Sequence, residues 1–122
     1  MKQLDAFTTA YAIAALWSTN DESNPQGGDP LDDNYNIVDI ADETLQQMID
    51  DCKKFREENK ELLELSGLSD EYAGHDFWLT RCGHGAGFWD RGSEDVFDQL
   101  TEACNKWGEV DLYVGDDGKI YH

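Results

Sequence analysis

Apolar side chains recur every three or four residues in three segments of the chain, residues 3–17, 42–65 and 93–107. Such spacing gathers them on one face of a helix, where they can pack against a core. Ser93 is suited to cap the third segment, and Gly67 and Gly108 follow the second and the third. The pattern therefore predicts three helices.

Two further segments, residues 75–91 and 110–121, change to the period of β-strands. The first alternates along HDFWLTR, continues through the glycine-dense CGHGAG and resumes strand character at Phe88, and the second contains an Asp-Gly turn. Both segments are predicted to be hairpins. Segregated hairpins and helices predict an α+β fold, an antiparallel sheet of about four strands packed against three helices.

Residues 18–36, between the first two predicted helices, are rich in acids and turn formers, with Pro25 and Pro30 on either side of Gly27-Gly28. We expect an acidic loop there. At 122 residues the chain has the size of one domain and shows no internal repeat. Residues 1–122 are therefore predicted to form a single domain.

Acidic residues outnumber basic ones by 27 to nine, which gives a formal net charge of -18. No run of basic residues is longer than Lys53-Lys54, whereas binding to DNA, RNA or an anionic membrane requires a basic patch. Direct binding to nucleic acid or to a membrane is therefore not expected. A basic protein partner is electrostatically favoured.

The three cysteines, Cys52, Cys82 and Cys104, are far apart and odd in number. This pattern is typical neither of a disulfide framework nor of a zinc module, so no metal or cofactor is predicted and a reducing compartment is expected. The apolar stretch within residues 1–17 contains Asp5, lacks a small-residue cleavage site and is too short to cross a bilayer. We expect a cytoplasmic protein.

The segments AGHDFWLTRCGHGAGFWDRG (residues 73–92) and EVDLYVGDDGKIYH (residues 109–122) resemble a family of small phage- and prophage-encoded proteins with no assigned activity. The resemblance extends to FTTAYAIAALWS and DIADETLQQMIDDC, and so covers nearly the whole chain outside residues 19–33. It implies a phage-type accessory protein in a bacterial host and transfers no catalytic residue. The family commonly has a small polar residue such as Asn at the position of Cys82, which argues against Cys82 as an obligate nucleophile or ligand.

The second predicted helix carries the first candidate site, a stripe of carboxylates within about 60° of one another on a helical wheel. Its members are Glu43, Asp50, Glu57, Glu61 and Glu64, with Asp29, Asp32 and Asp33 of the loop as additional contacts. Carboxylates one helical turn apart are separated by about 6 Å, which is comparable to the phosphate spacing of a nucleic acid. The stripe predicts a non-enzymatic protein that binds a basic host protein, as a nucleic-acid mimic or as an inhibitor of restriction, CRISPR or other nucleic-acid-handling machinery. The plainer interpretation is a solvated helix face that Lys53, Lys54 and Lys60 partly neutralise.

The first predicted hairpin carries the alternative site, for a small enzyme or a ligand-binding module. Its residues are His75, Arg81, His84, Trp89, Asp90 and Arg91. No catalytic residue is assigned, because adjacent strand residues such as His75 and Asp76 point to opposite faces and would not form an acid–base pair. The glycine-rich turn at residues 83–87 lacks the helix and the lysine of a phosphate loop, so a tight turn is the preferred interpretation.

A homo-oligomer built on the strand 119–121 or on Trp89 is a third interpretation, and the sequence leaves the oligomeric state open.

Overall fold

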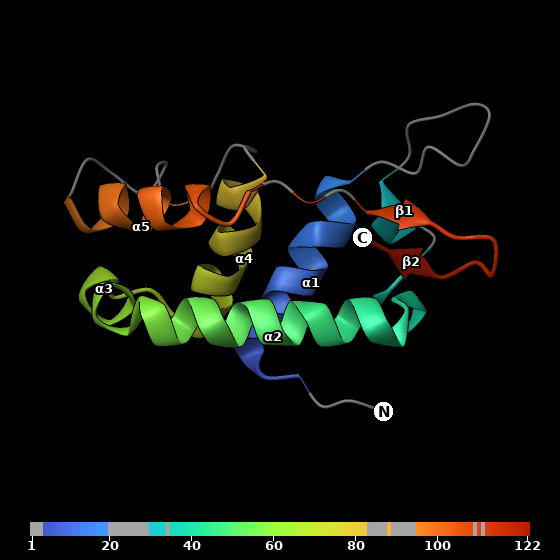
Figure 1. The fold of residues 1–122 in the computed structure, drawn as a ribbon, viewed down its shortest axis with the longest axis horizontal. Coiled ribbons are helices and arrows are strands. Elements are labelled where there is room, and N and C mark those ends of the chain that lie inside the picture. Colours follow the sequence, from blue (N-terminus) through green and yellow to red (C-terminus); the bar gives the residue numbers. More distant parts are fainter. Residues whose placement is uncertain are drawn as a thin grey trace.

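The computed structural model describes residues 4–19, 30–33, 35–82, 88, 95–108, 110 and 112–122. In these residues it contains five α-helices and one antiparallel sheet of two strands. The helices are α1 (Ala6–Ser18), α2 (Asp42–Glu58), α3 (Lys60–Ser66), α4 (Asp70–Arg81) and α5 (Asp95–Asn105), and the strands are β1 (Tyr113–Val114) and β2 (Ile120–Tyr121). Two 3-10 helices, η1 (Leu31–Asp33) and η2 (Ile37–Asp39), precede α2. Figure 1 shows α2 along the long axis, with α1 and α4 crossing the view behind it.

The helices predicted at 3–17 and 93–107 are present as α1 and α5. Asp5 caps α1 by accepting a hydrogen bond from the Thr8 N–H at 2.8 Å. Of the predicted acidic loop, residues 20–29 and 34 lie outside the described part of the chain. No described helix combines the length and the apolar character needed to cross a membrane.

The strand predicted at residues 75–81 is wrong, because these residues form the second half of α4. The predicted α+β fold with about four strands is therefore wrong as well, since the described sheet has two strands and most of the structure is helical. α4 is buried from Ala73 to Arg81 except at His75, and a helix buried on nearly every side shows no polar face from which to recognise its period. Its β-forming residues do not decide the structure, because tertiary packing outweighs intrinsic propensity.

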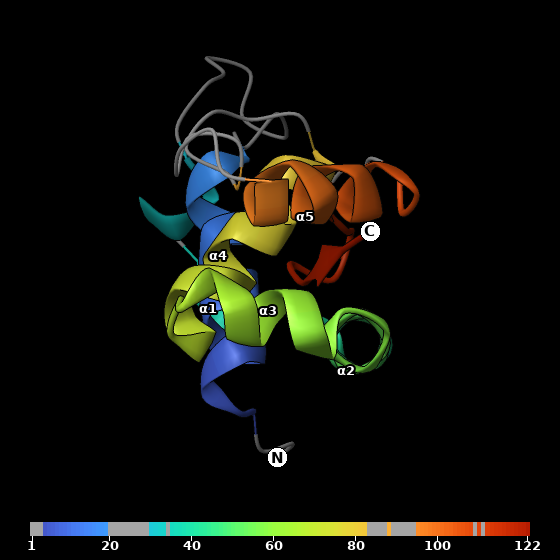
Figure 2. The same cartoon turned by 90° about the vertical axis from the view of Figure 1, so that its left-hand side faces the viewer.

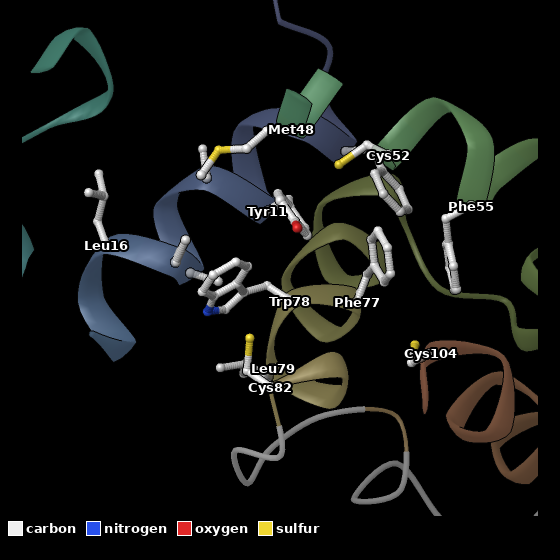
Figure 3. Packing of buried hydrophobic residues seen from close by; sticks show 14 of the residues in the cluster. Tyr11, Leu16, Met48, Cys52, Phe55, Phe77, Trp78, Leu79, Cys82 and Cys104 are labelled. Atoms are coloured by element: carbon white, nitrogen blue, oxygen red, sulfur yellow. The ribbon is translucent and has the colours of Figure 1, made fainter. Parts of the chain in front are cut away.

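α1 and α4 pack against each other and form the centre of the core. Phe55 of α2 stacks on Phe77 of α4 with ring centroids 4.0 Å apart, and Tyr11 of α1 meets Trp78 of α4 edge-on at 5.3 Å. Figure 3 shows these rings converging from three helices. Buried aromatic contacts of this kind stabilise a fold by about 0.5–1.5 kcal/mol each beyond the area that they bury.

The helix predicted over 42–65 is divided at Asn59 into α2 and α3. Asn59 leaves helical geometry (φ −121°, ψ 24°), and its backbone N–H and its side-chain amide both donate to the carbonyl of Phe55, each at 3.0 Å. Figure 2 views α2 end-on and shows α3 lying across it. α3 thereby packs against α5 instead of extending α2.

The C-terminal hairpin predicted over 110–121 is confirmed in its centre, where Tyr113 pairs with Tyr121 and Val114 with Ile120. Its turn closes with a hydrogen bond of 3.0 Å from the Gly118 N–H to the carbonyl of Gly115. Ile120 is buried, and its carbonyl accepts the N–H of Ala41 at 2.9 Å. This bond attaches the hairpin to the start of α2.

Candidate partner-binding surface

The outward face of α2 carries three of the predicted carboxylates, those of Glu43, Asp50 and Glu57. All three residues are exposed. Their spacing of seven residues places them nearly in line, about 10 Å apart at 1.5 Å per residue. They therefore form one row that is open to solvent.

Glu61 and Glu64 are also exposed, but they lie on α3, which runs across α2 (Figure 2). A helical wheel assumes one continuous helix, and the break at Asn59 removes that condition. The prediction that five carboxylates form a single stripe is therefore wrong. The row on α2 also lacks the expected phosphate-like spacing, because its members are two turns apart.

The predicted neutralisation of this row by lysines is not seen as direct ion pairing. Among the described residues, the ion pairs within 4.0 Å are made by Arg56, Arg81 and His75, and none by a lysine. Asp50 instead accepts a hydrogen bond from the Gln46 amide at 2.9 Å. The row thus retains its negative charges without a contacting cation from the described part of the chain.

The C-terminal end of the row nevertheless has a mixed charge environment. Glu57 and Glu64 line a groove of 560 Å³ together with Lys53, Arg56 and Lys60. Nearby cations weaken the field of these two carboxylates even without contact. The unneutralised part of the row is its N-terminal part.

That N-terminal part lies beside the C-terminal hairpin (Figure 1). Residues 39–51 contain no Lys or Arg, and residues 113–122 contain one, Lys119. The hydrogen bond of 2.7 Å that Tyr121 donates to Asp117 and the surrounding negative charge, Glu43 included, raise the pKa of Tyr121 to about 12. Five exposed carboxylates make up this acidic end of the molecule: Asp42, Glu43, Asp50, Asp116 and Asp117.

A second acidic face, which the sequence analysis missed, lies on α5. Asp95, Asp98 and Glu102 are exposed, and α5 contains no Lys or Arg. Their spacing of three and four residues was the available signal, since it places them on the side opposite the buried Phe97, Leu100 and Cys104.

Several predicted site residues lie outside the described part of the chain. Asp29 of the acidic loop is one of them, and the others are His84, Trp89, Asp90 and Arg91 of the alternative site. Asp32 is described and exposed in η1, and Asp33 follows it in the same 3-10 helix.

His75 and Arg81, the described members of the alternative site, have different neighbours on α4. His75 is partly exposed and stacks on Trp17 of α1 with ring centroids 5.7 Å apart. The Arg81 side chain is only 4% exposed and faces α2 and the segment that follows α5. The structure does not bring these two residues to a common point.

The Arg81 guanidinium donates hydrogen bonds to four acceptor groups. It donates to the Tyr11 hydroxyl at 3.1 Å, to the Asp51 carboxylate at 3.2 Å and to the carbonyls of Trp107 and Gly108 at 3.1 and 2.9 Å. Burial raises the pKa of Tyr11, so its phenol stays neutral and serves as an acceptor. A buried cation with this many partners is a structural group.

His75 and Asp76 were predicted to diverge, and this prediction is wrong. Nδ1 of His75 lies 3.1 Å from Oδ1 of Asp76, a hydrogen-bonding distance. Successive side chains are about 100° apart on a helix and 180° apart on a strand, so the change from strand to helix explains the contact. Asp76 is completely buried and thereby orients the His75 ring against Trp17.

The cysteines are buried, and no disulfide joins them. Burial raises the pKa of the Cys52 and Cys104 thiols, and the Cys82 thiol donates to the Val110 carbonyl at 3.4 Å. The Cys52 and Cys104 thiols are therefore protonated at neutral pH and poorly nucleophilic. No group of three His, Cys, Asp or Glu side chains within the described ranges is arranged to hold a metal ion.

Comparison with protein-family models, with curated proteins and with solved structures finds no match to this chain. The resemblance to small phage-encoded proteins therefore stays a prediction.

Proposed function

We propose that this chain is a non-enzymatic, phage-type binding protein whose acidic end engages a basic surface of a host protein in the bacterial cytoplasm. The observation that best supports this function is the separation of charge along the molecule. Among the described residues, Lys119 is the one cation of residues 39–51 and 113–122, whereas Lys53 and Lys54 begin one turn after Asp50 on α2 and Lys60 lies at the start of α3. A field polarised in this way orients an approaching partner and raises its association rate.

The size of the charge excess also supports a role in binding. A small domain needs a net charge of magnitude only about 2 to 8 to resist self-association. This chain has -18, and Arg81, one of its nine basic residues, is buried against Asp51 and contributes little to the outer surface. Self-repulsion of this size lowers the stability of the fold, which makes a compensating use of the charge reasonable.

The preferred partner is a nucleic-acid-binding enzyme or complex, including restriction and CRISPR machinery. Its groove is built to attract phosphates, so it also attracts a carboxylate surface. Because the α2 row does not repeat the phosphate spacing, the mimicry rests on the field of the acidic end and not on a phosphate-by-phosphate match.

The test compares two charge-reversal variants that change the net charge equally. The acidic-end variant carries Glu43→Lys, Asp50→Lys and Asp116→Lys, and the control carries Asp95→Lys, Asp98→Lys and Glu102→Lys on α5. The acidic-end variant alters one acid in the first turn of α2 and the control alters two in the first turn of α5, so the control is expected to lose at least as much stability as the acidic-end variant. Immobilised wild type and both variants, shown to be folded by circular dichroism, are incubated with host lysate, and mass spectrometry quantifies the captured proteins.

We expect the wild type and the α5 control to capture the same nucleic-acid-binding proteins, and the acidic-end variant to capture at least tenfold less. Added duplex DNA displaces these proteins, and capture falls as ionic strength rises toward 0.3 M. Capture that is indifferent to the acidic-end substitutions and to salt contradicts the proposed function. Equal losses in both variants assign capture to overall charge and contradict the role of the acidic end.

A further inference from the structure

α1 differs from its surroundings because it contains no charged residue over its 13 positions, in a chain that is 30% charged. Its buried positions face α4 and α2, and its remaining positions are small or apolar. Ala6, Thr9, Ala10, Ile13 and Trp17 occupy one outward face. Ile13 is 48% exposed and Trp17 is 39% exposed. An outward helix face of this kind is unusual unless another surface covers it.

This face borders a groove of 560 Å³ between α1 and α4. On the α4 side the groove is lined by Tyr72, which is 58% exposed, and by His75. Among the described residues that line it there is no Lys or Arg, whereas the exposed Glu71 contributes a carboxylate. The groove therefore has an apolar floor and an acidic edge.

We propose that this groove binds an amphipathic helix of a partner protein, with apolar side chains toward α1 and a Lys or Arg side chain toward Glu71. Ala6, Ala10, Ile13 and Trp17 follow the i, i+4, i+7, i+11 spacing along which two helices pack. They extend over about 16 Å, which matches roughly three turns of a bound helix.

Charge decides between a basic helix and a second copy of this chain as the occupant. A second copy would bring another net charge of -18 to an acidic edge, whereas a basic helix meets charges of opposite sign. The groove is a second surface, distinct from the acidic end, and its occupancy does not depend on the function proposed above.

The test uses a fluorescein-labelled 14-residue peptide with leucines on one helical face and lysines on the other, followed by fluorescence anisotropy at 0.15 M salt. Two further peptides serve as controls, one with serines in place of the leucines and one with glutamates in place of the lysines. The protein variants are Ile13→Asp, Ile13→Ala and, as the matched control, Leu65→Asp on α3, where Leu65 is 74% exposed. Ile13→Asp makes the protein more acidic, so any loss of affinity for a basic peptide reflects the lost apolar contact.

We expect the Leu/Lys peptide to bind the wild type and the Leu65→Asp variant equally, about tenfold more weakly to Ile13→Asp and a few-fold more weakly to Ile13→Ala. The serine and glutamate peptides bind at least tenfold more weakly than the Leu/Lys peptide. Reversal of Glu43 and Asp50 to Lys, which tests the acidic end, leaves the tenfold effect of Ile13→Asp in place. Thermal melts of both Ile13 variants exclude unfolding as the cause.

The proposal is overturned if the wild type does not bind the Leu/Lys peptide, if the serine peptide binds as well, or if Ile13→Asp and Leu65→Asp have equal effects. Sedimentation equilibrium provides one further outcome. A dimer of the wild type that Ile13→Asp dissociates assigns the groove to a second copy of this chain and overturns the partner-helix proposal.

Discussion

Gly74 of α4 lies directly against the backbone of Phe7 of α1, and a Cβ at position 74 would overlap the Phe7 carbonyl oxygen and lie 2.8 Å from its carbonyl carbon. The two helices meet backbone to backbone at this point. A flexible side chain could move aside, but a backbone carbonyl can move only if the helices separate.

Gly74→Ala should therefore destabilise the protein, although glycine is a poor residue for the interior of a helix. Replacing glycine by alanine in an unobstructed helix stabilises it by about 0.5–1 kcal/mol, whereas overpacking in a closed core costs about 1–3 kcal/mol. We expect a net loss of about 1–2 kcal/mol in the free energy of unfolding, measured by urea denaturation. An unchanged or increased stability would contradict the close contact of α1 and α4.

Arg81→Lys should destabilise the protein by about 2–3 kcal/mol, because an ammonium group cannot reach the Tyr11, Asp51, Trp107 and Gly108 acceptors together. Arg56→Lys is the control. Arg56 pairs with Asp5 at 2.6 Å, but its side chain is 35% exposed, so we expect a cost below about 1 kcal/mol.

A double-mutant cycle then identifies the ion pair within the Arg81 network. Arg81→Met combined with Asp51→Asn should cost less than the sum of the single substitutions, since removing both partners leaves neither charge buried alone. Additive costs, or equal costs for Arg81→Lys and Arg56→Lys, would contradict a structural role for the buried guanidinium.

The third prediction concerns acid stability through Asp5. Partial burial opposes ionisation, but the hydrogen bonds from Thr8 and the nearby Arg56 guanidinium together hold the pKa of Asp5 below its usual value. A carboxyl whose pKa is lower in the folded state stabilises the fold above the unfolded pKa of about 3.9, and this contribution is lost as the pH falls through the folded pKa.

Asp5→Asn keeps a good N-cap and removes only the charge. We expect it to cost about 0.5 kcal/mol at pH 7, a small value because the Asp5 side chain is 53% exposed, and to cost less at pH 2. Urea denaturation at the two pH values measures the difference. A constant cost across this range would show that the ion pair with Arg56 contributes nothing to stability.

Sequence reasoning succeeded where one face of an element is exposed. α1, α2 and α5 show the helical period because each has a solvent side, and the Asp-Gly turn marks the C-terminal hairpin. From Ala73 to Arg81, α4 has almost no solvent side, so its aromatic residues were mistaken for a strand. The sequence did mark the start of α4, because Ser69 is a good N-cap residue and two acids, Asp70 and Glu71, follow it. In the structure Ser69 accepts the Tyr72 N–H at 3.3 Å.

The candidate site was predicted in part. The orientation of α2 follows from its own sequence, and Glu43, Asp50 and Glu57 are exposed as expected. The break at Asn59 cannot be predicted from the sequence of α2, because no proline or glycine marks the break. The position of α3 depends instead on its packing against α5. The acidic end was missed because it joins α2 to a hairpin about 70 residues later in the chain, a proximity that local patterns do not contain.

Arg81 joins parts of the chain that are distant in sequence, and this has a consequence for how the protein loses its structure. The carbonyls of Trp107 and Gly108 supply two of its acceptors, so detaching the C-terminal segment would leave a charge inside the helical core without half of its partners. The last quarter of the chain therefore stabilises the packing of the helices that precede it. Heating should melt helices and hairpin in one cooperative step, and no stable helical remnant should outlast the hairpin.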